Sequence, residues 1–183
     1  MAEVLRKTAS SQLTMDYLLS VELAQDEKHI SWVKWLYASV NKHFMDRKGS
    51  YNLYIEGDER VFQNESEFAE LRIDGPFIKQ PQKNLYYFDL EINVLIQTHL
   101  DPNKLYKNLE AIGVFTKAFS NTICVYRYGD GIFDTSTLMG ELHLQRDLGE
   151  NVDINNYSII KEDTRLTQST IEGHYRLELW TGV

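Results

Sequence analysis

The alternation of residues from Leu85 to Thr98 constrains the fold of this chain more than any other feature. Every second side chain in this segment is apolar: Tyr86, Phe88, Leu90, Ile92, Val94 and Ile96. Polar residues, among them Asp89 and Glu91, occupy most positions between them. Because successive side chains of a strand point to opposite faces, the segment is predicted to be a central β-strand with one apolar face. Strands usually have about five or six residues, so this one is expected to continue beyond the sheet as half of a projecting hairpin.

Two segments have the spacing of amphipathic helices. The first runs from Asp26 to about Lys48, is expected to end at Gly49, and has an apolar stripe of Ile30, Val33, Tyr37, Val40 and Phe44. The second begins at Asp101-Pro102, which supplies an N-cap and a proline at the first helical position. Its apolar stripe consists of Leu105, Leu109, Ile112, Phe115 and Phe119.

Five shorter segments are predicted to be strands. They are Tyr51 to Ile55; Ala69 to Ile73, which Gly75-Pro76 is expected to end; Ile123 to Tyr128, an apolar run typical of a strand buried on both faces; Leu138 to Leu148; and Ile171 to Leu179. A polar, Asn-rich loop is expected from Gly149 to Asn156. Two helices can cover only one face of a single sheet. The sequence therefore predicts an α+β fold, in which a mixed, mainly antiparallel sheet has both helices packed on one face.

The N-terminal residues 1–25 are expected to form a strand or arm before a single domain of residues 26–183. Its apolar residues recur at every second position: Leu13, Met15, Tyr17, Leu19, Val21 and Leu23. Such a strand could pair with a neighbouring subunit or with its own sheet, and a helix is the competing interpretation. Trp32 and Trp35 lie off the apolar stripe of the first helix. Because spare aromatic side chains are common at interfaces, both tryptophans are predicted, with the arm, to contact another subunit.

The composition narrows the classes of function. A chain of 183 residues has the size of one domain, and its 19 basic and 27 acidic residues give a formal charge of −8. This charge disfavours sequence-independent attraction to nucleic acid or to an anionic membrane. The single cysteine, Cys124, cannot form an internal disulfide, and the N-terminal segment lacks the apolar core of a signal peptide, so folding in a reducing cytoplasm is expected. No apolar run approaches the roughly 20 residues of a membrane-spanning helix.

The sequence contains no recognisable group of catalytic residues, cofactor-binding motif or metal-ligand spacing. His143 and His174 could meet on adjacent strands with Glu141 or Glu172 as carboxylate partners, but two exposed strand histidines are the favoured interpretation. Cys124 is interpreted as a small buried hydrophobic residue rather than a reactive thiol. Asp89 and Glu91 are the best pair for acid and base chemistry, although a solvated strand face is favoured. The chain is therefore predicted not to be an enzyme.

The segment from Glu56 to Asp74 is unusually acidic. It holds seven carboxylates, Glu56, Asp58, Glu59, Glu65, Glu67, Glu70 and Asp74, against only Arg60 and Arg72. A solvated hairpin accounts for this pattern in a monomer. In a ring, one such element per subunit facing the axis would line a negatively charged channel, which repels DNA phosphates and lets a duplex slide without sticking.

The order of elements resembles the tail terminator proteins of long-tailed bacteriophages, and more loosely the ring-forming head-to-tail joining proteins. The segments that carry the resemblance are ISWVKWLYASVNKHF, NLYYFDLEINVLIQT, DPNKLYKNLEAIGVFTKAF and STIEGHYRLELW, which together span most of the chain after residue 25. The resemblance implies a homohexameric ring that caps the tail tube, stops its polymerisation and docks with the head connector. It implies no catalytic residues, and it places the protein in the virion neck after assembly in the host cytoplasm.

Two other functions remain open at this point. One is an α+β domain in which a small ligand or substrate binds between a long helix and a curved sheet, with Asp89, His143 and His174 as its polar groups. The other is a subunit of the tail tube or baseplate, which shares a strand-rich design but stacks without closing.

Overall fold

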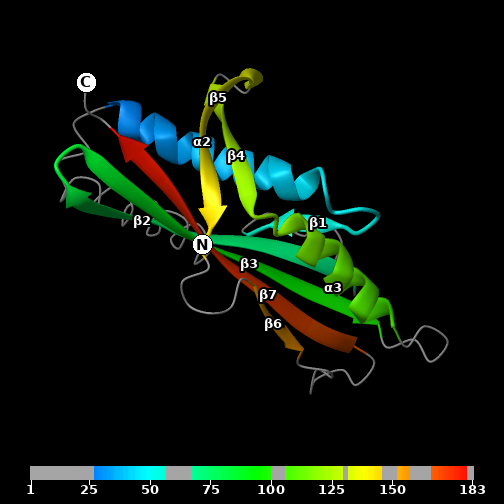
Figure 1. Ribbon diagram of the computed structural model, residues 1–183. Helices are drawn as coiled ribbons and strands as arrows, with labels where there is room; N and C mark the ends of the chain where they lie inside the picture. Colours follow the sequence, from blue (N-terminus) through cyan, green and yellow to red (C-terminus); the bar gives the residue numbers. More distant parts are fainter. Residues whose placement is uncertain are drawn as a thin grey trace, which may run out of the picture.

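The structure is a computed structural model that describes residues 27–56, 67–99, 106–129, 132–145, 152–156 and 166–180 (Figure 1). Its elements, in chain order, are α2 (Glu27–Met45), β1 (Leu53–Ile55), β2 (Phe68–Gln82), β3 (Leu85–His99), α3 (Lys107–Ala118), β4 (Thr122–Gly129), β5 (Ile132–Leu144), β6 (Asp153–Asn156) and β7 (Leu166–Trp180). The predicted N-terminal strand, with Leu13, Met15, Tyr17, Leu19, Val21 and Leu23, lies outside the described residues.

All seven described strands belong to one sheet. Its order is β1-β2-β3-β7-β5-β4, and β6 pairs with β7 beside this path. β1 runs parallel to β2, and the other neighbours are antiparallel. The predicted α+β fold with a mixed, mainly antiparallel sheet is confirmed.

The strand predicted from the long alternation is the centre of this sheet. β3 forms a hairpin with β2 and pairs with β7 along its whole length, from Leu85 opposite Trp180 to His99 opposite Leu166. The side chains of Phe88, Leu90 and the alternate residues up to Thr98 are buried. We call the face that carries them the inner face, and the opposite face, which carries Asp89, the outer face.

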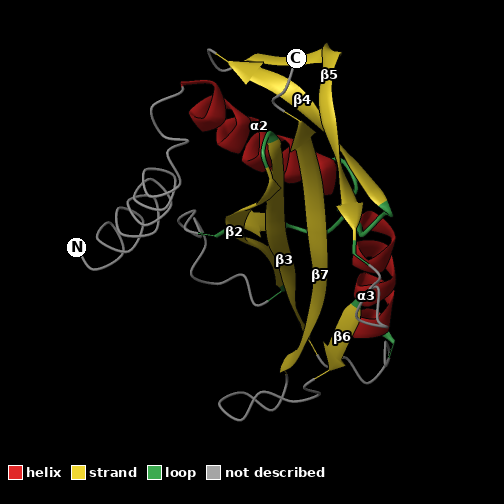
Figure 2. Cartoon of the chain, turned by 60° about the vertical axis from the view of Figure 1, so that its left-hand side comes forward, coloured by secondary structure: helices red, strands yellow, loops and turns green. Residues whose placement is uncertain are grey.

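Both helices pack on the inner face, as the sequence predicts. Ile112 and Phe115 of α3 are buried against β3 and β7, and α2 packs mainly along β4. The helices meet where Phe44 of α2 contacts Phe119, with 5.1 Å between the ring centroids. Figure 2 shows α2 near the β4–β5 end of the sheet and α3 nearer to β6. One continuous hydrophobic core therefore joins both helices to the sheet.

A small network of buried polar side chains fixes the start of α3 on the inner face. Asn108 donates to Thr98 Oγ1 at 3.2 Å and accepts from Ser169 Oγ at 2.7 Å. The hydroxyls of Thr98 and Thr167 lie 3.0 Å apart. Because each hydroxyl has a partner, the desolvation cost of burying it is offset.

The buried stripe of α2 differs in phase from the predicted one. Trp32, Leu36, Val40 and Phe44, spaced by four residues, are buried, whereas Val33 and Tyr37 lie at the edge of the core. The prediction that Trp32 is a spare aromatic for an interface is therefore wrong. The Trp32 ring lies in the core near Gly140, where the missing side chain leaves room for Leu177.

Several strand predictions also need correction. β2 does not end at Gly75-Pro76 but continues to Gln82, because a register shift between Asp74 and Phe77 absorbs the irregular residues. β4 is buried on one face only, since Ile123 and Val125 are buried whereas the alternate residues Thr122, Cys124 and Tyr126 are partly exposed. The end of the predicted Asn-rich loop contains β6, which pairs with β7.

His43 gives the fold an expected dependence on acid pH. Its Nε2 lies 2.8 Å from the carbonyl oxygen of Ala118, and burial lowers its pKa below the ordinary value of 6.5. The unfolded chain therefore takes up the proton first as the pH falls below about 6.5. We expect the free energy of unfolding to decrease from there until the pH reaches the folded pKa, and to be insensitive to His43 above 6.5. Urea unfolding between pH 5 and 8 should show a flatter profile for His43→Gln.

Candidate functional site

A cluster of charged side chains lies on the outer face at the centre of the sheet. Asp89 of β3 stands opposite Arg176 of β7 and Phe77 of β2. Arg176 donates from Nε to Asp89 Oδ1 at 2.6 Å, and Lys79 donates to Asp89 Oδ2 at 3.0 Å. The guanidinium of Arg176 also lies over the Tyr87 ring, 4.6 Å from its centroid. Three strands thus contribute to one ion-pair cluster.

The surroundings of Asp89 keep its carboxylate ionised. Burial alone would raise its pKa, but the hydrogen bonds and charges of Arg176 and Lys79 outweigh burial and hold the pKa below its ordinary value. The hydrogen bond to Asp89 in turn raises the pKa of Arg176. A carboxylate engaged by two cations is a poor proton acceptor, so this cluster suits a rigid binding surface better than acid and base chemistry.

The sequence identified Asp89 but not its partners. Lys79 lies beyond the predicted end of its strand. Arg176 has the strand parity that places it on the outer face, but parity does not say which residues of two strands stand opposite each other. That pairing depends on the register of β3 with β7 and β2, which no short motif in this chain records.

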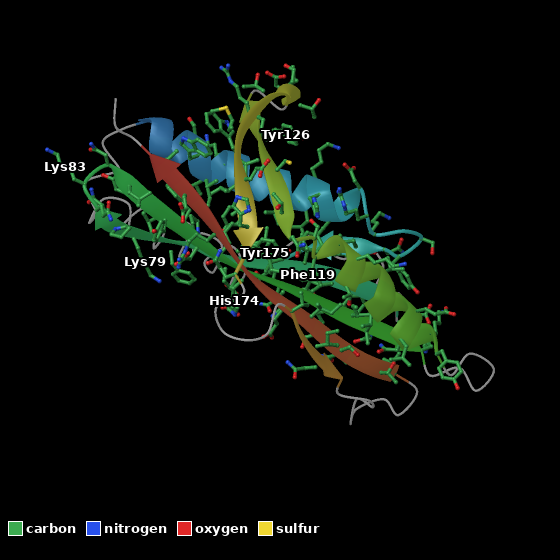
Figure 3. All side chains as sticks on the ribbon, in the orientation of Figure 1. Lys79, Lys83, Phe119, Tyr126, His174 and Tyr175 are labelled. Carbon is green, nitrogen blue, oxygen red and sulfur yellow. The ribbon has the colours of Figure 1, made fainter. Side chains whose placement is uncertain are left out.

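The two strand histidines lie on the outer face as well. His143 stands opposite Arg176, and His174 stands opposite Glu91. The side chains of both histidines are exposed, and His143 Nε2 lies 3.9 Å from Glu141 Oε2. In Figure 3, Tyr175 and Phe119 lie beside each other near the end of α3, and His174 lies on the other side of β7. The prediction that Asp89, His143 and His174 face a pocket between helix and sheet is wrong, because all three lie on the face opposite the helices.

The described members of the acidic segment have unlike environments. Glu67 forms an ion pair with Lys107 of α3 at 2.6 Å and accepts from the backbone N–H of His99. Burial would raise the pKa of Glu67, but these partners hold it below its ordinary value. Glu70 is 7% exposed and accepts two hydrogen bonds from Arg72. The charges of Glu67 and Glu70 are therefore compensated within the subunit.

Glu56 and Asp74 remain as exposed carboxylates of this segment. Both lie near Tyr37 of α2: burial, followed by the charges of Asp74 and Glu56, raises the pKa of Tyr37 to about 12. The Tyr37 hydroxyl donates to the carbonyl oxygen of Gly75. Asp58, Glu59 and Glu65 lie outside the described residues. The lining of a channel by these acidic residues stays a prediction.

Two further predicted residues lie on β4 or beside it. Trp35 is partly exposed and donates from Nε1 to the carbonyl oxygen of Tyr128 at 2.7 Å, so part of its surface is used within the subunit. Its place at an interface stays a prediction. Cys124 is partly exposed and stands opposite Glu141, which corrects its interpretation as a buried residue.

The ion pair of Asp89 and Arg176 should couple their contributions to stability. We expect a double-mutant cycle with Asp89→Ala and Arg176→Ala to give a coupling of about 1 kcal/mol, because both side chains are only partly exposed. The exposed pair Lys42–Asp46 is the matched control, with an expected coupling of about 0.3–0.5 kcal/mol. Because the pKa of Asp89 is lowered on folding, the coupling should be present above pH 4 and decline as the pH falls through the folded pKa. Equal coupling in both pairs would contradict a special role for the cluster.

In the parts of the chain that the structure describes, no three His, Cys, Asp or Glu side chains gather closely enough to hold a metal ion. None of the helices in these parts has the length and apolar character needed to cross a membrane.

No family model matches this sequence, and no curated protein matches it. One solved structure, whose name does not state a function, aligns with a TM-score of 0.47 at 8% identity, over 81% of this chain and 97% of that chain. A similarity at this level carries no information about function.

Proposed function

We propose that the protein is a structural subunit of a bacteriophage tail that forms a ring with copies of itself. The ring ends the tail tube, joins it to the head connector and lets DNA pass without specific binding. In this role the chain acts as a scaffold and carries out no catalysis. Closure with six subunits follows from the resemblance to tail terminator proteins.

The proposal is supported by the arrangement of the four segments that resemble tail terminator proteins, because they form one structural unit. α2, β3 with its hairpin partner β2, α3 and β7 form one unit in which β7 returns to pair with β3 along its full length. Both helices lie on the inner face, so the outer face of the central strands is free of helices in the described part of the chain. The ion pairs centred on Asp89 hold side chains of that face in place, as a surface that contacts another protein requires.

Analytical ultracentrifugation of the protein alone and with its tail tube protein tests the proposal. A ring of six should sediment with about six times the 21.4 kDa mass of the chain. A strict monomer under both conditions would contradict ring formation. Long stacks seen by electron microscopy, with no closed rings, would instead favour a tube subunit.

The ligand-binding alternative makes a different prediction. A pocket protein should remain a monomer or dimer, and its melting temperature should rise with a small ligand. The positions of Asp89, His143 and His174 on the outer face weaken this alternative, because its polar groups were expected between helix and sheet.

A further inference from the structure

In the described part of the chain, side chains bind three backbone groups on the outer edge of β4, where no other strand pairs with it. Among the described residues, β4 pairs only with β5. Leu144 N donates to Asn121 O at the start of this pairing, so the backbone groups of Thr122, on the opposite parity, face away from β5. An edge of this kind offers a row of N–H and C=O groups to any strand that approaches.

Three hydroxyl or indole groups bind backbone groups along this edge. Ser39 Oγ of α2 accepts from the backbone N–H of Tyr126 at 2.9 Å, and Trp35 Nε1 donates to Tyr128 O at 2.7 Å. Ser120 Oγ donates to Thr122 O at 2.7 Å. Trp35 and Ser39 are four residues apart and so share one side of α2. Figure 2 shows α2 running alongside β4, and Figure 3 labels Tyr126 on that strand.

Ser39 and Trp35, the two residues of α2 that bind the edge of β4, are held in place by their neighbours. Ser39 is 3% exposed, and the Trp35 ring meets Trp32 edge to face at a centroid distance of 5.3 Å. Tyr37, between them in sequence, anchors α2 to β2 through the carbonyl oxygen of Gly75. α2 therefore spans from the edge of β4 to β2, and Ser39 and Trp35 cannot leave that edge without moving the helix.

We propose that Ser39 and Trp35, with Ser120, form an edge guard that prevents β4 from pairing with β4 of a second copy of the chain. The β4 edges of two copies could pair antiparallel across a twofold axis. The guard blocks this pairing because it occupies backbone groups of Thr122, Tyr126 and Tyr128 that the second strand would need. The inference concerns β4 alone and does not depend on the proposed ring.

The test uses the full chain with Ser39→Ala, Trp35→Phe and the double variant. Loss of the Ser39 hydroxyl should speed amide hydrogen exchange at Tyr126 roughly tenfold, because one hydrogen bond is lost. In sedimentation velocity, the double variant should show a species larger than any in the wild type, and its fraction should grow with concentration. The single variant Ser39→Ala keeps the exchange measurement available if the double variant folds poorly.

Val40→Ala is the matched control. Val40 also belongs to α2 and is fully buried in the core, but it makes none of the three contacts with the edge of β4. The variant should lower the melting temperature without producing the larger species. The edge guard is refuted if the double variant sediments like the wild type at every concentration, or if Val40→Ala forms the same species.

Discussion

Gly75→Ala should unfold at a markedly lower urea concentration than the wild type, with a loss of about 3 kcal/mol in the free energy of unfolding. Gly75 has φ of +106°, a conformation that residues with a side chain rarely adopt. A Cβ added there would lie 2.7 Å from Asp89 O and 3.0 Å from Phe77 N. Both contacts are with backbone, so a rotamer change cannot relieve them.

The effect should extend beyond stability, because Gly75 lies where α2 is bound to β2 and where the register of β2 shifts. Its carbonyl oxygen accepts the hydrogen bond from Tyr37, and the register shift beside it sets the positions of Asp74 and Phe77 on β2. A shifted backbone would therefore loosen α2 as well as the β2–β3 hairpin. Faster amide exchange in α2, measured under conditions where Gly75→Ala is still folded, would demonstrate this coupling.

Gly113→Ala is the control for this substitution. Gly113 lies in α3, and a Cβ added there meets nothing within 4 Å. Alanine is favoured over glycine in a helix by up to about 1 kcal/mol, so this variant should be more stable than the wild type. Equal destabilisation by both substitutions would show that the close approach at Gly75 does not determine its effect.

Periodicity predicted the fold where one face of an element is buried and the other is not. β3 has this character from Phe88 to Thr98, so its apolar parity gave its inner face. The expected projection beyond the sheet is wrong, because β7 pairs with β3 along its whole length. α2 does not have this character, because it contacts β4 on one side and β2 on another and has apolar residues around much of its circumference. The sequence placed Val40 and Phe44 in the core correctly. It chose Val33 and Tyr37 over Trp32 and Leu36 for the first half of the helix, because that choice depends on the neighbouring strands.

Contacts between distant segments limited the prediction of the site. Asp89 was recognised from its strand, but its partner Arg176 is 87 residues away and is brought opposite by the register of β3 and β7. Likewise, nothing near Glu67 in sequence indicates that Lys107 of α3 neutralises it. A count of charges along the chain therefore overstated the acidity of the segment from Glu56 to Asp74, because Glu67 and Glu70 form ion pairs that compensate their charges.

The ion pairs of Glu67 and Glu70 make these two residues unsuitable for a test of the proposed DNA passage. Reversing Glu67 or Glu70 would break ion pairs with Lys107 or Arg72 and confound assembly with transport. Glu56 and Asp74 are exposed, lie near the same tyrosine and form no ion pair within the described ranges. They are the described carboxylates whose charge can be reversed with the least damage to the subunit.

We expect particles with Glu56→Lys and Asp74→Lys to assemble normally but to deliver their genome at least about tenfold less efficiently. Each subunit would present two lysines to the passage, and every subunit of the ring would do the same. The lysines would bind DNA phosphates and release counterions, whereas the carboxylates they replace repel the phosphates. Because charges are screened beyond about 8 Å at physiological salt, the effect requires that these side chains lie close to the DNA. Neutral Glu56→Gln and Asp74→Asn should give a smaller defect, and higher salt should relieve the lysine variant.

The control reverses the same number of charges elsewhere, with Glu110→Lys on α3 and Glu178→Lys on β7, both exposed and without an ion pair among the described residues. It matches the change in net charge and should leave delivery unchanged. Normal delivery by the Glu56 and Asp74 variant would place this element on the outside of the ring, and an equal defect in the control would indicate a general effect of charge. A defect confined to Glu56 and Asp74 and relieved by salt would instead require that DNA passes along the side of the subunit where α2 meets β2, because both carboxylates lie near Tyr37 at that place.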